Sequence, residues 1–213
     1  MTVWFTSDLH FGHSNIIGYS GRPFADVRGM DRGLVERWND VVRPDDTIWV
    51  LGDLAMGNIA DSLALVGELA GHKRLVTGNH DRCWYGHRRH ADVAKIEMWA
   101  VRYLDAGFEE IHQGKITIDV GGRRVDVCHF PYAGDSHDLD RYVDERPIDG
   151  GGWLLHGHVH ERWRQRQRMI NVGVDAWDYR PVDTPTLVAL MEQGPADLER
   201  LPATSRSAQI SVN

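Results

Sequence analysis

The chain has 213 residues, of which 42% are hydrophobic, and a formal net charge of −7. This length fits a single domain with a sizeable core, and the negative charge gives no reason to expect long-range attraction to nucleic acid. No run reaches the roughly 18 apolar residues that a membrane span needs. The first residues lack the basic and apolar regions of a signal peptide, and Cys83 and Cys128 are too few for a disulfide framework. We therefore expect a cytoplasmic protein with two free thiols.

The first half of the chain predicts strands that alternate with helices. Apolar runs and helical spacing of apolar residues are the evidence for these elements. Strands are expected at the start of segment 2–10, at 47–51 and at 72–77, and helices at 26–42, 58–70 and 91–106. Such alternation indicates a mostly parallel sheet with crossover helices.

The second half predicts antiparallel pairing. Gly121 and Gly122 lie between two apolar segments, 115–120 and 123–128, which is a strong signal for a β-hairpin. Further strands are expected at 153–155, 168–172 and 186–191, with a polar loop at 133–152. From residue 193 the chain is polar and predicts a surface tail. We expect one domain at residues 1–192, built as two packed sheets with helices outside, and a tail at 193–213.

Polar side chains follow several of the predicted strands. Asp8 and His10 come just after the first strand, and in an extended chain side chains two residues apart point the same way. Open α/β sheets place ligands at the carboxyl ends of their strands, and a carboxylate with an imidazole suits a borderline divalent metal. Similar side chains recur at later strand ends, at Asp53, Asn79, His80, His129, His158 and His160.

Taken singly, these residues have simpler interpretations. An aspartate after a strand could cap a helix, Asn79 could be a turn residue, and His129 could bond the backbone. His158 and His160 are harder to explain in this way, because two imidazoles two residues apart share one face of a strand. The order of the whole set therefore carries more information than any member of it.

Five short motifs occur in a fixed order along the chain. They are Asp8-Leu9-His10, Gly52-Asp53, Gly78-Asn79-His80-Asp81, the single His129, and Gly157-His158-Val159-His160. In this order they resemble the motifs of the calcineurin-like metallophosphoesterases, and the resemblance spans residues 4 to about 173. It implies an α/β fold, a four-layer αββα sandwich of two mixed β-sheets flanked by helices.

The resemblance also implies a centre with two divalent metal ions. The first ion would take Asp8, His10 and His160, the second Asn79, His129 and His158, and Asp53 would bridge them. A hydroxide between the ions would attack phosphorus in line. His80 would donate a proton or a hydrogen bond to the leaving oxygen. Such ligands suit Mn²⁺, which we favour, and also Fe, Zn²⁺, Co²⁺ or Ni²⁺.

The substrate must be inferred from what surrounds the metals. The phosphoprotein phosphatases of this family carry a second aspartate and an arginine soon after their Gly-Asp motif, and segment 52–57 has neither. The short chain looks more like small bacterial and phage phosphoesterases. We expect a phosphodiesterase that acts on small nucleotide diesters, with 2′,3′- or 3′,5′-cyclic nucleotides as leading candidates.

Other functions stay open at this point. A nuclease is one alternative, since the run 162–168 is locally basic although the chain is acidic. A phosphomonoesterase, a phosphoprotein phosphatase and an inactive metal-binding scaffold of the same fold are the others, although the scaffold would require gaps in the ligand set. Long nucleic acid and a membrane are not expected as partners, and the sequence leaves the oligomeric state open.

The loop at 82–90 is the predicted substrate contact. Arg82 could steer a phosphate, and Trp84 or Tyr85 could stack on a base. The alternative interpretation is a solvated loop. His13 and His156 are expected near the metals without being ligands.

Overall fold

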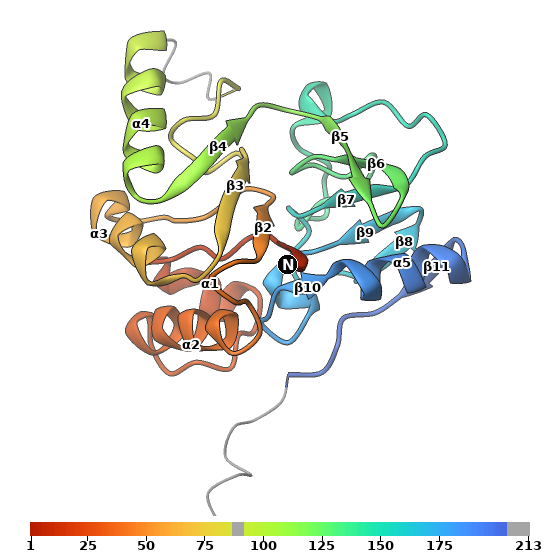
Figure 1. Cartoon of the computed structure of the whole chain (residues 1–213), viewed down its shortest axis with the longest axis horizontal. Coiled ribbons are helices and arrows are strands. Elements are labelled where there is room, and N and C mark those ends of the chain that lie inside the picture. The colour runs from red at the N-terminus through yellow and green to blue at the C-terminus, as the bar shows by residue number, and fades with distance from the viewer. Residues whose placement is uncertain (87–91, 204–213) are drawn as a thin grey trace, which may run out of the picture.

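The computed structural model describes residues 1–86 and 92–203 of the chain. Two β-sheets pack against each other, with helices around them (Figure 1). This arrangement confirms the predicted class, two mixed sheets flanked by helices.

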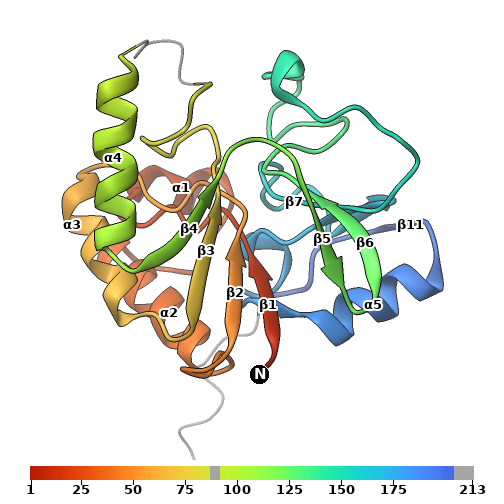
Figure 2. The ribbon, with the colours of Figure 1, turned by 45° about the horizontal axis from the view of Figure 1, so that its top comes forward.

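The first sheet is mostly parallel. Its strand order is β10-β1-β2-β3-β4, and β10 is the strand that runs antiparallel to its neighbour. The strands are β1 (Val3–Thr6), β2 (Thr47–Val50), β3 (His72–Val76), β4 (Phe108–His112) and β10 (Val182–Asp183). Figure 2 shows β1 to β4 pointing the same way, so the segments that follow them meet at one edge of the sheet.

Helices accompany the first sheet on its outer side (Figure 2). They are α1 (Ser14–Tyr19), α2 (Val27–Asn39), α3 (Ile59–Ala64) followed by a 3₁₀ turn (Leu65–Glu68), and α4 (Val93–Asp105). The Asp26 carboxylate caps α2 by accepting a hydrogen bond of 2.8 Å from the backbone of Gly29. From this start α2 buries Met30, Leu34 and Trp38 at helical spacing, which fixes its inner face.

The second sheet has the strand order β11-β8-β9-β7-β6-β5 and mixes parallel and antiparallel pairs. Its strands are β5 (Ile116–Val120), β6 (Arg123–Val127), β7 (Leu154–His156), β8 (Gln165–Gln167), β9 (Met169–Asn171) and β11 (Ala196–Leu198). Two 3₁₀ turns (Val143–Glu145 and Val174–Ala176) and α5 (Thr184–Gln193) complete the fold.

Two large apolar clusters hold these layers together. One lies between the first sheet and α2 to α4, and it includes Leu34, Trp38 and Leu75. The other joins the two sheets, where Phe5 of β1 and Leu155 of β7 are both fully buried. The site described below lies where both sheets end, so both clusters contribute to its rigidity.

The structure differs from the sequence prediction in the last part of the chain. Residues 186–191 were expected as a strand, but they belong to α5, because Asp183 caps a helix start and Pro185 lies in the first turn. The tail expected from residue 193 contributes β11, which pairs with β8. Its polar composition concealed this strand, and residues 204–213 lie outside the described residues.

Three smaller differences concern the first sheet. Strand β4 was not predicted, and neither was β10, which has 2 residues and therefore too short a pattern to detect. The helix expected at 58–70 divides into α3 and a 3₁₀ turn. The longest helices among residues 1–86 and 92–203 have 13 residues, and none has the length and apolarity to cross a bilayer.

Replacing Leu75 with alanine tests the first cluster. Leu75 is fully buried in β3, between β2 and β4, so we expect Leu75→Ala to lower the free energy of unfolding by about 2–5 kcal/mol. Denaturant titration measures this change. Leu139→Ala is the matched control. The Leu139 side chain is 81% exposed, so its replacement should change the free energy of unfolding little. Equal effects of the two variants would contradict this account of the core.

Candidate metal centre

The seven predicted ligands gather where the two sheets end, but not by the predicted strand geometry. Strand β1 ends at Thr6, and Asp8 and His10 have positive φ angles of 57° and 53°. Asp53, His158 and His160 have positive φ as well. A left-handed backbone at residues other than glycine costs about 1–2 kcal/mol each and is concentrated at functional sites. Tight turns, and not the alternation of a regular strand, therefore aim these side chains inward.

Two motif glycines make room for this convergence. A Cβ on Gly157 would collide with the Ser7 hydroxyl and with the Asp8 carboxylate. Gly52 has a φ of +88°, and a Cβ there would lie 2.7 Å from Nδ1 of His129. Any side chain at either position would displace a predicted ligand, which is a physical reason for glycine in these motifs.

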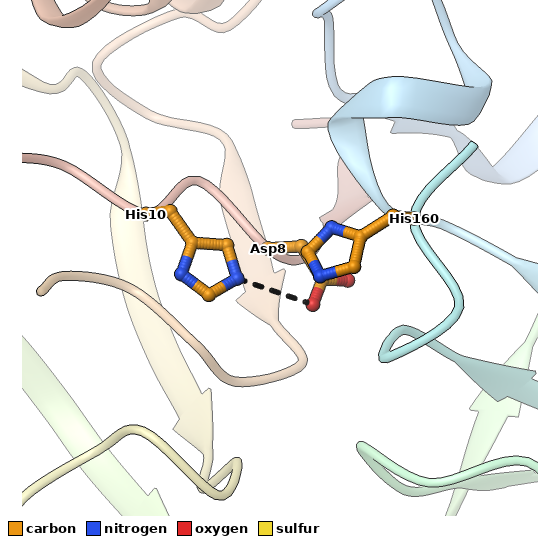
Figure 3. A group of neighbouring side chains, drawn as sticks. All are labelled: Asp8, His10 and His160. Carbon is orange, nitrogen blue, oxygen red and sulfur yellow. Dashed lines mark ion pairs between the residues drawn. The ribbon is translucent and has the colours of Figure 1, made fainter. Parts of the chain in front are cut away.

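Asp8, His10 and His160 form the first group of possible metal ligands. One ligand atom from each lies within 4.8 Å of the others, and Figure 3 shows His160 converging from a separate segment on Asp8 and His10, which share the segment after β1. His10 is only 1% exposed, and neither of its ring nitrogens has a hydrogen-bond partner among residues 1–86 and 92–203. Burial holds the pKa of His10 well below its usual range, so the ring is neutral and able to coordinate a cation.

His129, Asp53 and Asn79 form the second group. Nδ1 of His129 donates to the carbonyl of Leu51 at 2.7 Å, so Nε2 is the ring nitrogen that faces the site. This Nε2 lies 3.1 Å from Oδ1 of Asn79 and 3.5 Å from Oδ2 of Asp53. Three electron-rich atoms that face one another are an arrangement that a cation would stabilise. Asp8 with Asp53 and His129 also meets the spacing of a metal site.

Asp53 lies between the two groups. Its Oδ2 is 3.7 Å from Nε2 of His10 and 3.5 Å from Nε2 of His129. Burial by itself would raise the pKa of this carboxyl. The nearby His129 and His80 lower the pKa by more than burial raises it, so the net shift is downward and favours the carboxylate. This position suits the bridging role that the sequence predicts for Asp53.

Outer hydrogen bonds orient two further histidines. Nε2 of His158 donates to Asp135 at 3.0 Å, which leaves Nδ1 as the nitrogen for a ligand position. Nδ1 of His160 lies 3.1 Å from Asp175, which leaves Nε2. Metal-ligating histidines are commonly oriented in this way, with the second ring nitrogen bonded to a carboxylate or a carbonyl. The residues present therefore fit two divalent ions.

A buried ion pair supports the first group from behind. Arg22 donates to both oxygens of Asp175 at 2.8 Å, and it also donates to the backbone carbonyls of Asp8 and Leu9. Burial would raise the pKa of Asp175, but Arg22 outweighs it and lowers the value to about 2. The ionised Asp175 then holds the ring of His160, while Arg22 fixes the backbone between Asp8 and His10.

A cleft of about 520 Å³ opens over these residues. Its floor includes His10, Asp53, Asn79, His158 and His160, and the partly exposed His80 lies beside them. Residues of and next to α1, with His13 and Tyr19 among them, form one part of its wall. Loop 133–152 forms another part with Ser136, His137 and Arg141.

Residues 82–86, the described part of the loop predicted to contact substrate, do not line this cleft. Trp84 is 5% exposed and packs beside Cys128, Phe130 and Leu154, so stacking of a base on its ring does not fit the structure. Tyr85 is exposed, and neither Tyr85 nor Arg82 is among the residues around the cleft. Residues 87–91 lie outside the described residues. Trp84 is buried because its large apolar ring packs into this cluster.

The two other histidines lie near the site, as the sequence predicts. His13 is part of the cleft wall and its ring centroid is 5.4 Å from that of His10. His156 is fully buried in β7, and burial lowers its pKa to about 3. His156 does not share a face with His158 and His160, because β7 ends at His156 and the chain turns there.

Comparison with known proteins identifies the family. The model of the calcineurin-like phosphoesterase superfamily domain matches residues 1–193. The chain belongs to this family. It is 37% identical to the gene 66 protein of Mycobacterium phage D29 over 190 residues, which is 85% of this chain and 92% of the phage protein.

Two further relatives have no assigned function. An uncharacterized protein of Methanocaldococcus jannaschii is 29% identical over 201 residues, covering 90% of this chain and 92% of the relative. A protein of unknown function from Aquifex aeolicus is 26% identical and aligns with a TM-score of 0.64, covering 89% of this chain and 98% of the other. Calcineurin-like phosphoesterases depend on metal ions, so the residue groups described above are the candidate sites for them.

The supporting roles of Arg22, Asp135 and Asp175 were not predicted from the sequence. Asp175 follows β9 closely, so another acidic residue after a strand was a signal that could have been used. Asp135 is one of many acidic residues in a polar loop, and Arg22 lies outside every motif. Nothing in the sequence distinguishes these two from their neighbours.

Asp135→Asn tests the outer hydrogen bond to His158. The Asp135 carboxylate is fully buried, so its replacement removes the charge that holds the ring, and we expect one of two Mn²⁺ binding events to weaken by about 10–100-fold. Calorimetric titration of the metal-free protein measures this affinity directly. Asp138→Asn is the matched control in the same loop, since that carboxylate is 96% exposed. Unchanged affinity in Asp135→Asn would contradict the orientation of His158 described here.

Proposed function

We propose that this phosphoesterase is a phosphodiesterase for small nucleotide diesters, with 2′,3′- or 3′,5′-cyclic nucleotides as the leading candidates. Membership of the family supports a phosphoester hydrolase in general. The preference for a diester rests on the charge of the cleft, which is the observation that carries the proposal.

The cleft offers few positive side chains to a phosphate. Among its described lining residues, Arg141 is the single lysine or arginine, and its guanidinium is already paired with Asp135 at 2.8 Å. Arg22 lies beneath the floor and is fully engaged with Asp175 and with backbone carbonyls. A phosphomonoester carries two negative charges near neutral pH, whereas a diester carries one. A cleft with one paired arginine therefore favours the diester.

The metal ions complete the charge balance in this proposal. Two divalent ions held by the seven ligands would neutralise the phosphate and supply a nucleophilic water at neutral pH. Imidazole, carboxylate and amide oxygen together suit Mn²⁺, and they also suit Fe, Zn²⁺, Co²⁺ or Ni²⁺. The protein's own contribution is to orient these ligands by Leu51, Asp135 and Asp175 before any substrate binds.

His80 is the residue that we propose as the proton donor. Its ring lies 3.9 Å from Oδ2 of Asp53, its side chain is 38% exposed, and it lines the cleft. Its backbone N–H donates to Oδ1 of Asp53 at 2.8 Å, which fixes the backbone of His80 beside the floor while the side chain is partly open to solvent. Such a group can give a proton to a leaving oxygen and recover it from water.

The alternatives are supported less well. The basic run expected to suit a nuclease forms β8 and its flanks, where Arg164 lies over Trp177 and Arg166 lies over Trp163. Both guanidinium groups therefore stabilise the protein itself. The ligand groups found here also argue against an inactive scaffold. A cytoplasmic location is part of the proposal, because Cys83 and Cys128 are buried and unpaired.

The direct test compares two substrates with one leaving group. With Mn²⁺ present, we expect a higher kcat/KM for bis(p-nitrophenyl) phosphate than for p-nitrophenyl phosphate, because Arg141 is the single lysine or arginine among the described lining residues of the cleft. Release of p-nitrophenolate measures both rates. Asp53→Ala is the control for background activity and should lose metal binding and turnover together. A faster reaction with the monoester would overturn the diesterase proposal.

The role of His80 has a separate test. We expect His80→Ala to bind metal as the wild type does but to lose about 10²–10⁴-fold in kcat, with the largest loss for alkyl leaving groups that need a proton. Steady-state rates across a series of leaving groups measure this dependence. His72→Ala is the control, since His72 is an exposed surface histidine paired with Glu109. A wild-type rate with an alkyl leaving group would refute proton donation by His80.

A further inference from the structure

Tyr19 is an aromatic residue of the cleft wall that the protein does not use for packing. Its side chain is 74% exposed although it lines the cleft above the candidate metal centre. Helix α1 buries Ile16 and half-buries Ile17 against the core, so the helix is anchored without Tyr19. An exposed tyrosine elsewhere on a surface would need no explanation, but this one faces the space above the metal ligands.

The ring of Tyr19 is accessible from the cleft. It meets His13 edge to face, with ring centroids 6.3 Å apart and an angle of 74° between the planes. His13 is therefore one neighbour of the tyrosine ring, and the 74% exposure of the Tyr19 side chain leaves most of the ring accessible for stacking. His13 in turn lies 5.4 Å from His10 of the first ligand group, so Tyr19 is two rings away from the metal position.

Arg141 restricts the space from another part of the wall. Its Nε and Nη2 both donate to Oδ1 of Asp135, at 3.2 and 2.8 Å, so the guanidinium is fixed beside the cleft. Asp135 also holds His158 of the floor. A phosphate above the floor would therefore meet a fixed cation from loop 133–152 and an open aromatic ring next to α1. The volume of about 520 Å³ lies within the usual range for a site that binds one small organic ligand.

We propose that Tyr19 stacks on the base of a nucleotide substrate, while Arg141 contacts the phosphate, and that Tyr19 thereby selects diesters that carry a nucleoside. This inference rests on the proposed phosphodiesterase function and names the residue that recognises its substrate. Tyr19 takes the stacking role that was predicted for Trp84, which is buried, or for Tyr85, which does not line the cleft. Stacking suits this position because every base has a π-face, so the residue would accept several bases.

The test uses two diesters with the same leaving group. Thymidine 5′-(p-nitrophenyl phosphate) carries a base, and methyl p-nitrophenyl phosphate does not. We expect the wild-type ratio of their kcat/KM values to favour the thymidine ester and to fall by about 5- to 100-fold in Tyr19→Ala, which is the usual contribution of one base–aromatic stack. Tyr19→Phe keeps the ring and should keep the ratio, which separates stacking from the hydroxyl group.

Other variants distinguish competing explanations. Tyr85→Ala should keep the wild-type ratio, and a fall of the ratio in Tyr85→Ala but not in Tyr19→Ala would overturn the proposal. A ratio in Tyr19→Ala equal to that of the wild type would overturn it too. Arg141→Gln should raise KM for both diesters equally, compared with Arg162→Gln, whose exposed arginine is paired with Asp138 outside the cleft lining.

A binding measurement keeps this inference separate from the proposed activity. Calorimetry with the Mn²⁺-loaded protein would compare thymidine 5′-monophosphate with 2-deoxyribose 5-phosphate, which lacks the base. We expect the wild type to prefer the nucleotide and Tyr19→Ala to bind both alike. If the wild type hydrolyses neither diester, the proposed function fails while this comparison still tests Tyr19. Equal binding of the two compounds by the wild type would refute base stacking.

Discussion

The burial of two carboxylates, Asp8 and Asp53, is the constraint on which the rest of this structure depends. Both side chains are at most 2% exposed, and moving an ionised carboxylate out of water costs several kcal/mol. Backbone N–H groups of His158 and His80 offset part of this cost by donating to them. The surrounding imidazoles direct lone pairs at the same space. Such a concentration of electron-rich atoms is stable with cations among them, as expected for a metal-dependent family.

The fold meets this constraint by joining its two sheets at the site. Tight turns after β1 and β2 bring in Asp8 and Asp53, and the turn after β7 brings in His158 and His160 from the second sheet. Because both sheets share one apolar cluster, their relative position is fixed. Outer hydrogen bonds then set the orientation of the His129, His158 and His160 rings, so the ligand geometry does not depend on the metal alone.

Loop 133–152 and α1 form the wall of the cleft above the candidate metal centre. In the loop, Asp135 accepts a hydrogen bond from His158, and Arg141 and Arg146 pair with the same carboxylate. The loop therefore connects the floor of the cleft with its wall. Metal ligands of this kind serve many phosphoesterases, whereas the side chains above them decide which ester fits.

The sequence by itself determined the family and the two mixed sheets, and it predicted the seven side chains that the fold brings together. It could do so because the ligands lie in short motifs whose glycines, such as Gly52 and Gly157, occupy places where a Cβ would collide with a ligand. Only the tertiary structure decided which residues support and surround them. Asp135 and Asp175 bond to histidines that lie 23 and 15 residues away in the sequence. Trp84 is buried and Tyr19 is exposed, although the sequence around each gave no sign of this difference. Contacts between distant segments have no local signature, so hydrogen bonding, burial and the choice of cleft residues came from packing alone.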